Sequence, residues 1–196
     1  MGILGKKVLV LGLSKSGIAA AKLAKKHGAV VYLTEGKDVT SENLYKVEEL
    51  KNLGINVEYG AHSDEFINNA DLVVTSPGIP PHSEIIQRIR KQNIPVMSEL
   101  ELAYRECDIP FIIITGTNGK TTTTALTEHI LARKLNVKAC GNIGQPPCNI
   151  ADENLDYFVC EASSFQLEMS TSLKPFISVW TNFTPDHIDW HQGLEN

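Results

Sequence analysis

The stretch GTNGKTTTTAL, residues 116–126, directly follows the apolar run IPFIIIT, residues 109–115. A buried core has little use for two glycines, a lysine and four consecutive threonines, because glycine loses much entropy on folding and threonine is only a moderate helix former. A strand, a glycine-rich turn with a lysine and then a helix place backbone N–H groups around an anion. The stretch therefore predicts a phosphate-binding loop of the P-loop type.

Within this loop we expect Lys120 to contact the outer phosphates and the Thr121 hydroxyl to bind Mg²⁺. The strict pattern has a glycine where this chain has Ile114, so TGTNGKT is a shortened relative of it. The alternative interpretation is a solvated Gly/Asn turn capped by threonines. It explains neither the lysine nor the buried type of strand before the loop.

The composition is that of a globular protein, with 42% hydrophobic and 21% charged residues in a chain of 196. The net charge of −5 argues against a nucleic-acid or anionic-membrane surface, and the apolar runs are too short to span a bilayer. We therefore expect a cytoplasmic protein with no nucleic-acid or membrane partner. We expect reduced, mostly buried thiols at the four cysteines, which form no C-x-x-C pair: Cys107, Cys140, Cys148 and Cys160.

Short Val/Ile/Leu runs alternate with amphipathic helical windows along the chain. The expected strand and helix pairs are 6–13 and 17–29, 30–36 and 41–54, 71–78 and 82–93, and 109–115 and 120–135. This alternation is typical of parallel strands covered by helices on both faces, so the predicted fold class is α/β. A capping box from Ser98 to Glu101 predicts a short helix that leads into the strand at Ile109.

A second nucleotide-type unit begins in the middle of the chain, which indicates two domains with a junction near Ile94 and Pro95. We expect a Rossmann-like domain with a parallel sheet over residues 1–94 and an incomplete P-loop-type α/β domain over residues 95–196. The last stretch, VWTNFTPDHIDWHQGLEN, closes no evident helix or strand. We therefore expect the chain to be a fragment of a longer enzyme.

The stretch VLVLGLSKSGIAAA, residues 8–21, has Gly12 ending a strand and Gly17 opening a helix, as in a dinucleotide fingerprint. Ser14 stands in place of the middle glycine, which weakens the case for a dinucleotide pyrophosphate. Glu35, at the end of the next strand, is positioned for a ribose hydroxyl. Three interpretations stay open: another nucleotide diphosphate, NAD(P), or a structural turn.

Other strands also end in polar residues. TSPGIPP, residues 75–81, is either a ligand-binding turn at the carboxyl edge or a plain connection. Glu161 ends a buried run, and an acid there is the usual partner of a phosphate loop because Mg²⁺ prefers hard oxygen ligands. Asn142 lies between two glycines. A polar loop or a metal site explains equally well the cluster of Asp186, His187, Asp189 and His191.

Seven motifs, in order along nearly the whole chain, resemble those of the Mur ligases. They are GLSKSG (12–17), SPGIP (76–80), SELEL (98–102), TGTNGKTT (115–122), GNIG (141–144), EASSFQLE (161–168) and NFTPDHIDWH (182–191). SPGIP together with SSFQLE is most similar to the family members that add D-glutamate. The resemblance implies a Rossmann-like domain that holds the UDP of a sugar nucleotide, followed by an ATP-binding domain.

The resemblance also implies the site residues. The UDP-sugar would be bound by Ser14, Lys15, Ser16, Glu35, Gly36, Lys37, Ser76, Gly78, Asn142 and Ser163. ATP would be bound by Gly116, Thr117, Asn118, Gly119, Lys120, Thr121 and Thr122. The catalytic residues would be Lys120, Glu161 and His187. The metal ligands would be Thr121 and Glu161 for a first Mg²⁺ and His187 for a second.

The implied reaction is ATP-dependent: ATP phosphorylates the carboxylate of UDP-N-acetylmuramoyl-L-alanine, and the amine of D-glutamate then attacks the acyl phosphate. Such chemistry needs mainly positioning and charge neutralisation. The cofactors would be ATP and two Mg²⁺ ions, in a monomer that serves peptidoglycan precursor synthesis. The family's carbamylated lysine and D-glutamate-binding residues would lie beyond Asn196, so the chain alone is predicted to be inactive.

Other functions explain fewer motifs. A nicotinamide-dependent oxidoreductase would account for GLSKSG and Glu35 but gives residues 116–187 no purpose. A P-loop NTPase switch or transport module would account for Lys120 and Glu161 but leaves the loop at Gly12 without one. A nucleotide-binding fragment without catalysis is the non-enzymatic alternative.

Overall fold

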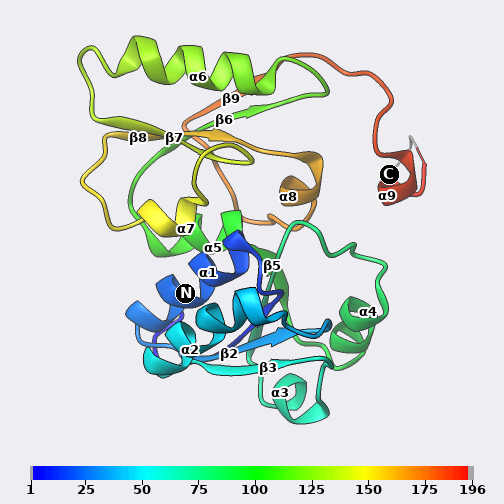
Figure 1. The fold of residues 1–196 in the computed structure, drawn as a ribbon. Coiled ribbons are helices and arrows are strands. Elements are labelled where there is room, and N and C mark those ends of the chain that lie inside the picture. Colours follow the sequence, from blue (N-terminus) through cyan, green and yellow to red (C-terminus); the bar gives the residue numbers. More distant parts are fainter. Residues whose placement is uncertain (1, 194–196) are drawn as a thin grey trace.

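A computed structural model describes residues 2–193, so Met1 and residues 194–196 of the predicted second domain lie outside it. The chain forms two sheets, and every strand pairing in them is parallel (Figure 1). The first sheet has the order β3-β2-β1-β4-β5 and the second the order β7-β8-β6-β9. Helices follow most strands, as parallel connections require. The predicted α/β class is therefore confirmed.

The strands of the first sheet are β1 (Lys7–Leu11), β2 (Val30–Glu35), β3 (Asn56–Tyr59), β4 (Leu72–Thr75) and β5 (Val96–Ser98). Its connections contain α1 (Lys15–Lys26), the 3₁₀ turn η1 (Ser41–Asn43), α2 (Leu44–Asn52), α3 (Asp64–Asn68) and α4 (Glu84–Lys91). The second sheet consists of β6 (Phe111–Thr115), β7 (Val137–Gly141), β8 (Tyr157–Glu161) and β9 (Ile177–Trp180). The remaining helices are α5 (Glu99–Glu106), α6 (Lys120–Leu131), α7 (Pro147–Ile150), α8 (Ser164–Glu168) and α9 (Ile188–His191).

Two expectations about element boundaries need correction. The helix predicted over residues 120–135 ends at Leu131, and the stretch from residue 179 onward does contain regular structure, since β9 ends at Trp180 and α9 follows. Strand β9 was missed because its pairing with β6 is a long-range contact, which a local pattern does not report. Strand β5 completes the first sheet although it follows residues 94–95. A domain junction at those residues stays a prediction.

Two global expectations can also be compared with the structure. All four cysteines are free, and all but Cys107 are buried, as expected. Across residues 2–193, the structure contains no helix with both the length and the apolar character that a membrane crossing requires.

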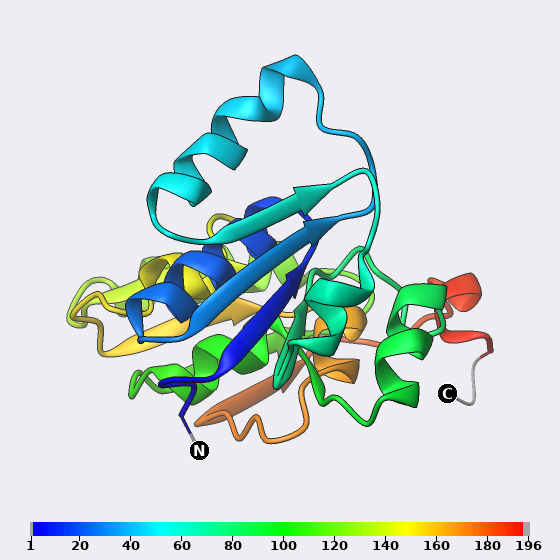
Figure 2. The same ribbon diagram turned by 90° about the horizontal axis from the view of Figure 1, so that it is seen from below.

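Strand β1 sends alternate side chains into two different cores. Val8 and Val10 pack with the buried face of α1, whereas Leu9 and Leu11 pack with residues of α3 and α4. Strand side chains alternate between the two faces, and both rows are buried here because helices cover both faces. Figure 2 shows β1, β2 and β3 running side by side, with β3 at the edge of the first sheet.

One hydrophobic core joins the two sheets. Helices α1, α5 and α7 lie between the sheets, and each contacts the other two (Figure 1). The core runs from Val10 in β1 to Phe111 and Phe158, whose rings meet edge to face with centroids 4.7 Å apart. The buried face of α1 is rich in small side chains, which let neighbouring helices approach closely: Ala19, Ala20, Ala21 and Ala24.

Charged groups reinforce this junction at the end of α1. The two ring nitrogens of His27 lie 3.3 Å from a carboxylate oxygen of Glu106 and 3.2 Å from one of Asp152. Lys26 pairs with Asp152 at 2.7 Å, and this hydrogen bond lowers the pKa of the Asp152 carboxyl. Cationic groups at a helix C-terminus also interact favourably with the helix dipole. The end of α1 is therefore tied to α5 and to the residues after α7.

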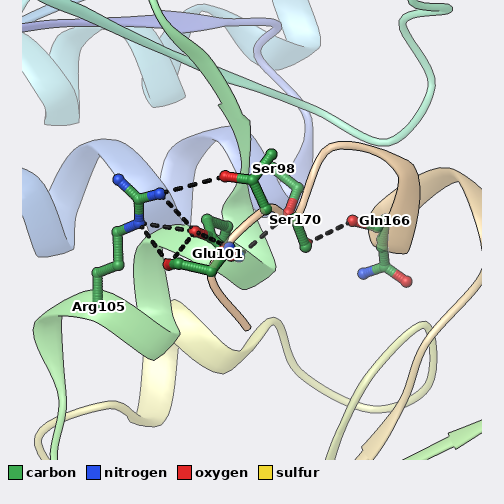
Figure 3. Close-up of polar contacts among 7 residues, drawn as sticks. Ser98, Glu101, Arg105, Gln166 and Ser170 are labelled. Atoms are coloured by element: carbon green, nitrogen blue, oxygen red, sulfur yellow. Dashed lines mark hydrogen bonds and ion pairs between the residues drawn. The ribbon is translucent and has the colours of Figure 1, made fainter. Parts of the chain in front are cut away.

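A buried carboxylate ties the start of α5 to the segment after α8 (Figure 3). The Glu101 side chain is 0% exposed, and its Oε1 accepts hydrogen bonds from Arg105 Nε at 2.7 Å and from the Ser172 N–H at 3.0 Å. The Ser98 hydroxyl caps α5 by accepting the Glu101 N–H at 3.0 Å, and it lies 2.7 Å from the Ser170 hydroxyl. The predicted capping box is half formed, because the Glu101 side chain binds Arg105 and Ser172 instead of Ser98.

We predict that Arg105→Met lowers the free energy of unfolding by about 3 kcal/mol, because it leaves the buried Glu101 carboxylate without its cationic partner. Urea denaturation measures this change. The control is Lys22→Met, which removes one half of the exposed pair Lys22–Glu49 and should cost less than about 1 kcal/mol. Equal losses in the two variants would contradict the importance of the buried pair.

Candidate active site

The predicted phosphate loop follows the strand at the switch point of the second sheet. β6 pairs with β8 on one side and β9 on the other, and ligands of open parallel sheets bind at such points. Gly119 has a φ of 82° and forms the N-cap of α6, which begins at Lys120. Because the first N–H groups of a helix have no partner within the helix, they are available to an anion.

Residues that follow β9 hold this loop in shape. The N–H groups of Thr117 and Asn118 donate to the backbone oxygen and the side-chain oxygen of Asn182, at 3.1 and 3.0 Å. The Thr181 hydroxyl donates to the Asn118 carbonyl at 2.7 Å. A Cβ at Gly116, where φ is 130°, would lie 2.3 Å from the Thr181 hydroxyl oxygen, so only glycine fits. Sequence analysis missed the role of Thr181 and Asn182.

The lysine of the loop folds back over it. Lys120 Nζ donates to the carbonyl oxygens of Gly116 at 2.7 Å and Thr117 at 3.0 Å. This places a positive charge beside the N–H groups that begin α6. The cation and the helix N-terminus would therefore attract an anion to the same place. Thr122, the last predicted residue of the loop, is exposed on the first turn of α6.

Three predicted residues from different elements meet beside this loop. The Glu161 carboxylate is buried at the end of β8, where its Oε2 accepts a hydrogen bond from the Thr121 hydroxyl at 2.8 Å and its Oε1 accepts one from the Asn142 amide at 2.8 Å. Two oxygens that bind one octahedral Mg²⁺ at about 2.1 Å are about 3 Å apart. The hydroxyl and carboxylate of Thr121 and Glu161 therefore fit neighbouring positions around such an ion.

His187 lies in a different setting. Its side chain is 56% exposed, its ring packs edge to face on Phe165 at 4.7 Å between centroids, and its Nε2 is 3.6 Å from Asp186. Within the described residues, no group of three or more His, Cys, Asp and Glu could hold a metal ion, and the side chain of Asp189 lies outside those residues. A role for His187 in metal binding stays a prediction.

A cavity of about 870 Å³ opens at the carboxyl ends of β1, β2 and β4. β1 pairs with both β2 and β4, so this too is a switch point. Every residue predicted to bind the UDP-sugar lines the cavity except Ser163, which instead caps α8 through a capping box with Gln166. The second half of the chain contributes to the same wall through Gly141, Asn142, Gly144, Pro146 and Gln166.

The serine that replaces the middle glycine of the fingerprint is a helix cap. Ser14 Oγ accepts the Gly17 N–H at 3.1 Å and lies 2.8 Å from Ser76 Oγ, which in turn donates to the Leu11 carbonyl at 2.9 Å. A Cβ at Gly17 would lie 2.0 Å from the Gly12 carbonyl oxygen, so α1 starts in close contact with the end of β1. Gly12 and Gly17, the first and third glycines of the fingerprint, therefore keep the structural roles that glycine has in such a loop.

Two charged side chains of the cavity hold its loops in place. The two Glu35 carboxylate oxygens accept the N–H groups of Leu13 at 2.9 Å and Lys37 at 3.1 Å, which fixes the loops after β1 and β2. Lys15 Nζ donates to the Gly144 carbonyl at 2.5 Å, which joins the first loop to the second half of the chain. The predicted UDP-sugar residues other than Ser163 are therefore brought together across both halves.

The cavity is also lined by Glu99, which sequence analysis missed. Glu99 is 1% exposed, its Oε1 accepts the Cys148 N–H at 2.7 Å, and its Oε2 has no hydrogen-bond partner in the described structure. Burial raises the pKa of the Glu99 carboxyl to about 7, although the hydrogen bond from Cys148 opposes the rise. The sequence signal that could have identified Glu99 was an acidic residue directly after a strand, in the motif SELEL.

The two halves of the chain match two different domains of one protein family. Residues 6–98 match the Mur ligase MurD-like N-terminal domain, and residues 114–196 match the Mur ligase middle domain. The two matches together cover most of the chain, so the chain belongs to the Mur ligase family.

Relatives from several bacteria support this assignment. The chain is 41% identical over 200 residues to the UDP-N-acetylmuramoylalanine–D-glutamate ligase of Caldicellulosiruptor saccharolyticus and 44% identical over 203 residues to that of Thermoanaerobacter pseudethanolicus. Both matches cover 100% of this chain but 44% of the relative. The chain therefore spans less than half the length of these relatives.

Solved structures of Mur-type ligases share the fold. UDP-N-acetylmuramate:L-alanyl-gamma-D-glutamyl-meso-diaminopimelate ligase from Neisseria meningitides gives a TM-score of 0.59 at 20% identity, over 95% of this chain and 63% of that one. UDP-N-acetylmuramate-alanine ligase from Thermotoga maritima gives 0.53 at 24% identity, over 95% and 44%. These similarities concern the fold.

We predict that Gly116→Ala destabilises the chain by about 3 kcal/mol, because the new methyl group overlaps the segment after β9 in a backbone conformation that favours glycine. Gly119→Ala is the matched control: its φ is also positive, but its Cβ would meet nothing within 4 Å, so a loss of about 1 kcal/mol is expected. Chemical denaturation compares the two variants. A larger loss for Gly119→Ala would contradict this account of the loop.

Proposed function

We propose that this chain is the UDP-sugar-binding domain and part of the ATP-binding domain of a ligase that adds D-glutamate to UDP-N-acetylmuramoyl-L-alanine in peptidoglycan precursor synthesis. Its identity of 41–44% over the whole chain to ligases of that name supports this choice of substrate within the family. The ligase is proposed to work as a cytoplasmic monomer.

One observation carries the proposal: a hydrogen-bonded chain of residues joins the cavity of the first sheet to the phosphate loop of the second. Asn142 lines the cavity and donates to Glu161, and Glu161 accepts from Thr121 in the first turn after the loop. A ligand in the cavity and a nucleotide on the loop would therefore lie on two sides of one polar cluster. This arrangement suits transfer of a phosphoryl group from one bound molecule to the other.

The proposed reaction has two steps. A carboxylate oxygen of UDP-N-acetylmuramoyl-L-alanine attacks the γ-phosphorus of ATP, which breaks the bond to ADP and gives an acyl phosphate. The D-glutamate amine then attacks the acyl carbon, loses a proton and expels inorganic phosphate, which leaves an amide. Both partners of the first step are anions, so the site must cancel negative charge and hold the reacting atoms in line.

The residues are assigned to these tasks as follows. Lys120 and the N–H groups at the start of α6 bind the phosphates of ATP, and Thr121 and Glu161 hold a first Mg²⁺, which would supply further positive charge. His187 is proposed as a ligand of a second Mg²⁺. Ser163 is proposed to contact the substrate or a phosphate. Its hydroxyl would then release the N-cap hydrogen bond of α8 and bind the ligand instead. The residues around the cavity bind the UDP-sugar.

A nicotinamide-dependent oxidoreductase is the alternative for the first half, because Gly12, Gly17 and Glu35 keep the positions of a dinucleotide site. Two features favour the sugar nucleotide. Ser14 carries a side chain where a dinucleotide site has its middle glycine, and the cavity extends to the second half of the chain.

Calorimetry tests the choice of ligand. UDP-N-acetylmuramoyl-L-alanine is expected to bind the wild-type chain, and NADH is not. Lys15→Met should weaken sugar-nucleotide binding about tenfold or more, because a charge-assisted contact contributes about 1.5–3 kcal/mol. Lys25→Met, on the same helix but bonded to Gly54 away from the cavity, should leave the affinity unchanged. Tighter binding of NADH than of the sugar nucleotide would overturn the proposal.

We further expect no ligase turnover from these 196 residues, because they span 44% of the length of the relative from Caldicellulosiruptor saccharolyticus. Phosphate release is measured with UDP-N-acetylmuramoyl-L-alanine, D-glutamate, ATP and Mg²⁺. Omission of D-glutamate controls for simple ATP hydrolysis. Robust D-glutamate-dependent release from the chain alone would contradict the expectation, while leaving the proposed ligands intact.

A further inference from the structure

Glu99 differs from the other buried acids of α5. Three glutamates of this helix each have one buried oxygen without a hydrogen-bond partner among the described residues: Glu99, Glu101 and Glu106. Glu101 is compensated by Arg105, and Glu106 faces a ring nitrogen of His27. Glu99 has no cationic partner among the described ion pairs, and it alone of the three lines the cavity.

One oxygen of the Glu99 carboxyl group has a protein partner and the other has none among the described residues. Oε1 is held by the Cys148 N–H at the start of α7, which fixes the orientation of the carboxyl group. A buried oxygen without a partner costs about 1–3 kcal/mol, so its presence calls for an explanation. Since Glu99 lines the cavity of about 870 Å³, a bound molecule can supply the missing hydrogen bond.

The groups around Glu99 do not replace that partner. On the packed elements they are the Cys148 thiol of α7 and the Cys160 thiol of β8, whose pKa values are both raised, so neither supplies a charge near neutrality. Glu161 borders Cys160 and is engaged with Thr121 and Asn142. The other charged or titratable groups that line the cavity are Lys15, Glu35, Lys37, Asp38, Lys46 and His62.

We propose that Glu99 is a ligand-binding residue whose Oε2, in the carboxylate form, accepts a hydrogen bond from a hydroxyl or amide N–H group of the bound sugar nucleotide. The identity of that ligand rests on the proposed function. A sugar nucleotide carries many such donors, whereas its phosphate oxygens are acceptors that an ionised Glu99 would repel. Glu99 therefore selects the part of the ligand that faces α5.

This role of Glu99 determines whether binding of the sugar nucleotide tightens or weakens as the pH rises. Burial raises the pKa of Glu99 to about 7 in the chain without ligand, so below that pH the carboxyl is mostly protonated. A ligand that donates to the carboxylate lowers this pKa, and binding must then release a proton. Binding is expected to tighten as pH rises to about 7, by up to about tenfold for each pH unit, and to level off above it.

Calorimetry with UDP-N-acetylmuramoyl-L-alanine between pH 5.5 and 8.5 tests this on the wild type, Glu99→Gln and Glu101→Gln. In Glu99→Gln the amide oxygen keeps the hydrogen bond from the Cys148 N–H, so an NH₂ donor takes the place of the acceptor Oε2. We expect about tenfold weaker binding above pH 7 and loss of the Glu99 pH dependence. Glu101→Gln, a buried acid on the same helix outside the cavity lining, should keep the wild-type affinity and profile.

A second readout does not depend on a variant that folds. Carboxyl ¹³C chemical shifts of wild-type chain labelled at glutamate should show the Glu99 pKa falling when the sugar nucleotide is added. A wild-type affinity that is flat or weakens with rising pH, or a Glu99 pKa that rises on binding, would overturn the inference alone. Absence of any sugar-nucleotide binding by the wild type would overturn the proposed function, and the inference with it.

Discussion

The packing of α1 against α5 and α7 is the constraint on which the rest of the structure depends. α1 begins at the loop that forms one wall of the cavity, and α7 follows the Gly141–Pro146 segment that forms another. Because the buried face of α1 is mostly alanine, these helices pack closely and the two sheets share one core. Close-packed protein interiors transmit small displacements, so the packing of this core sets the spacing between the two glycine-containing loops.

The chain binds anions, in the proposed function, while carrying a net charge of −5. The structure accounts for this by using local donors. The loops offer N–H groups at the starts of α1 and α6, with Lys15 and Lys120 beside them. Glu35 and Glu161 stand close to these loops, yet the oxygens of each already accept hydrogen bonds from the protein. Their charges therefore shape the loops and do not face a phosphate unscreened.

Sequence reasoning reached the features that local patterns encode. The alternation of apolar runs predicted the parallel α/β class, and the glycine loops marked both switch points. Local sequence patterns did not predict the features that depend on residues far away in the chain. Thr181 and Asn182 shape the phosphate loop through contacts with residues more than 60 positions away, and β9 is a strand because β6 lies beside it. Glu99 belongs to the same group, since its role depends on Cys148 and on a cavity that no local pattern describes.

Three buried acids illustrate how surroundings assign different tasks to one side chain. Glu101 is paired with Arg105 and serves stability, because its Oε1 accepts from Arg105 and from Ser172 and so holds α5 to the segment after α8. Glu161 accepts from a hydroxyl and an amide, which leaves its oxygens oriented for a hard cation. Glu99 has one hydrogen-bonded oxygen and one buried oxygen without a partner in the described structure, and burial raises its pKa toward neutrality. A carboxyl that titrates near neutral pH inside a cavity responds to the donors of a ligand, so substrate recognition and proton release are coupled at that position.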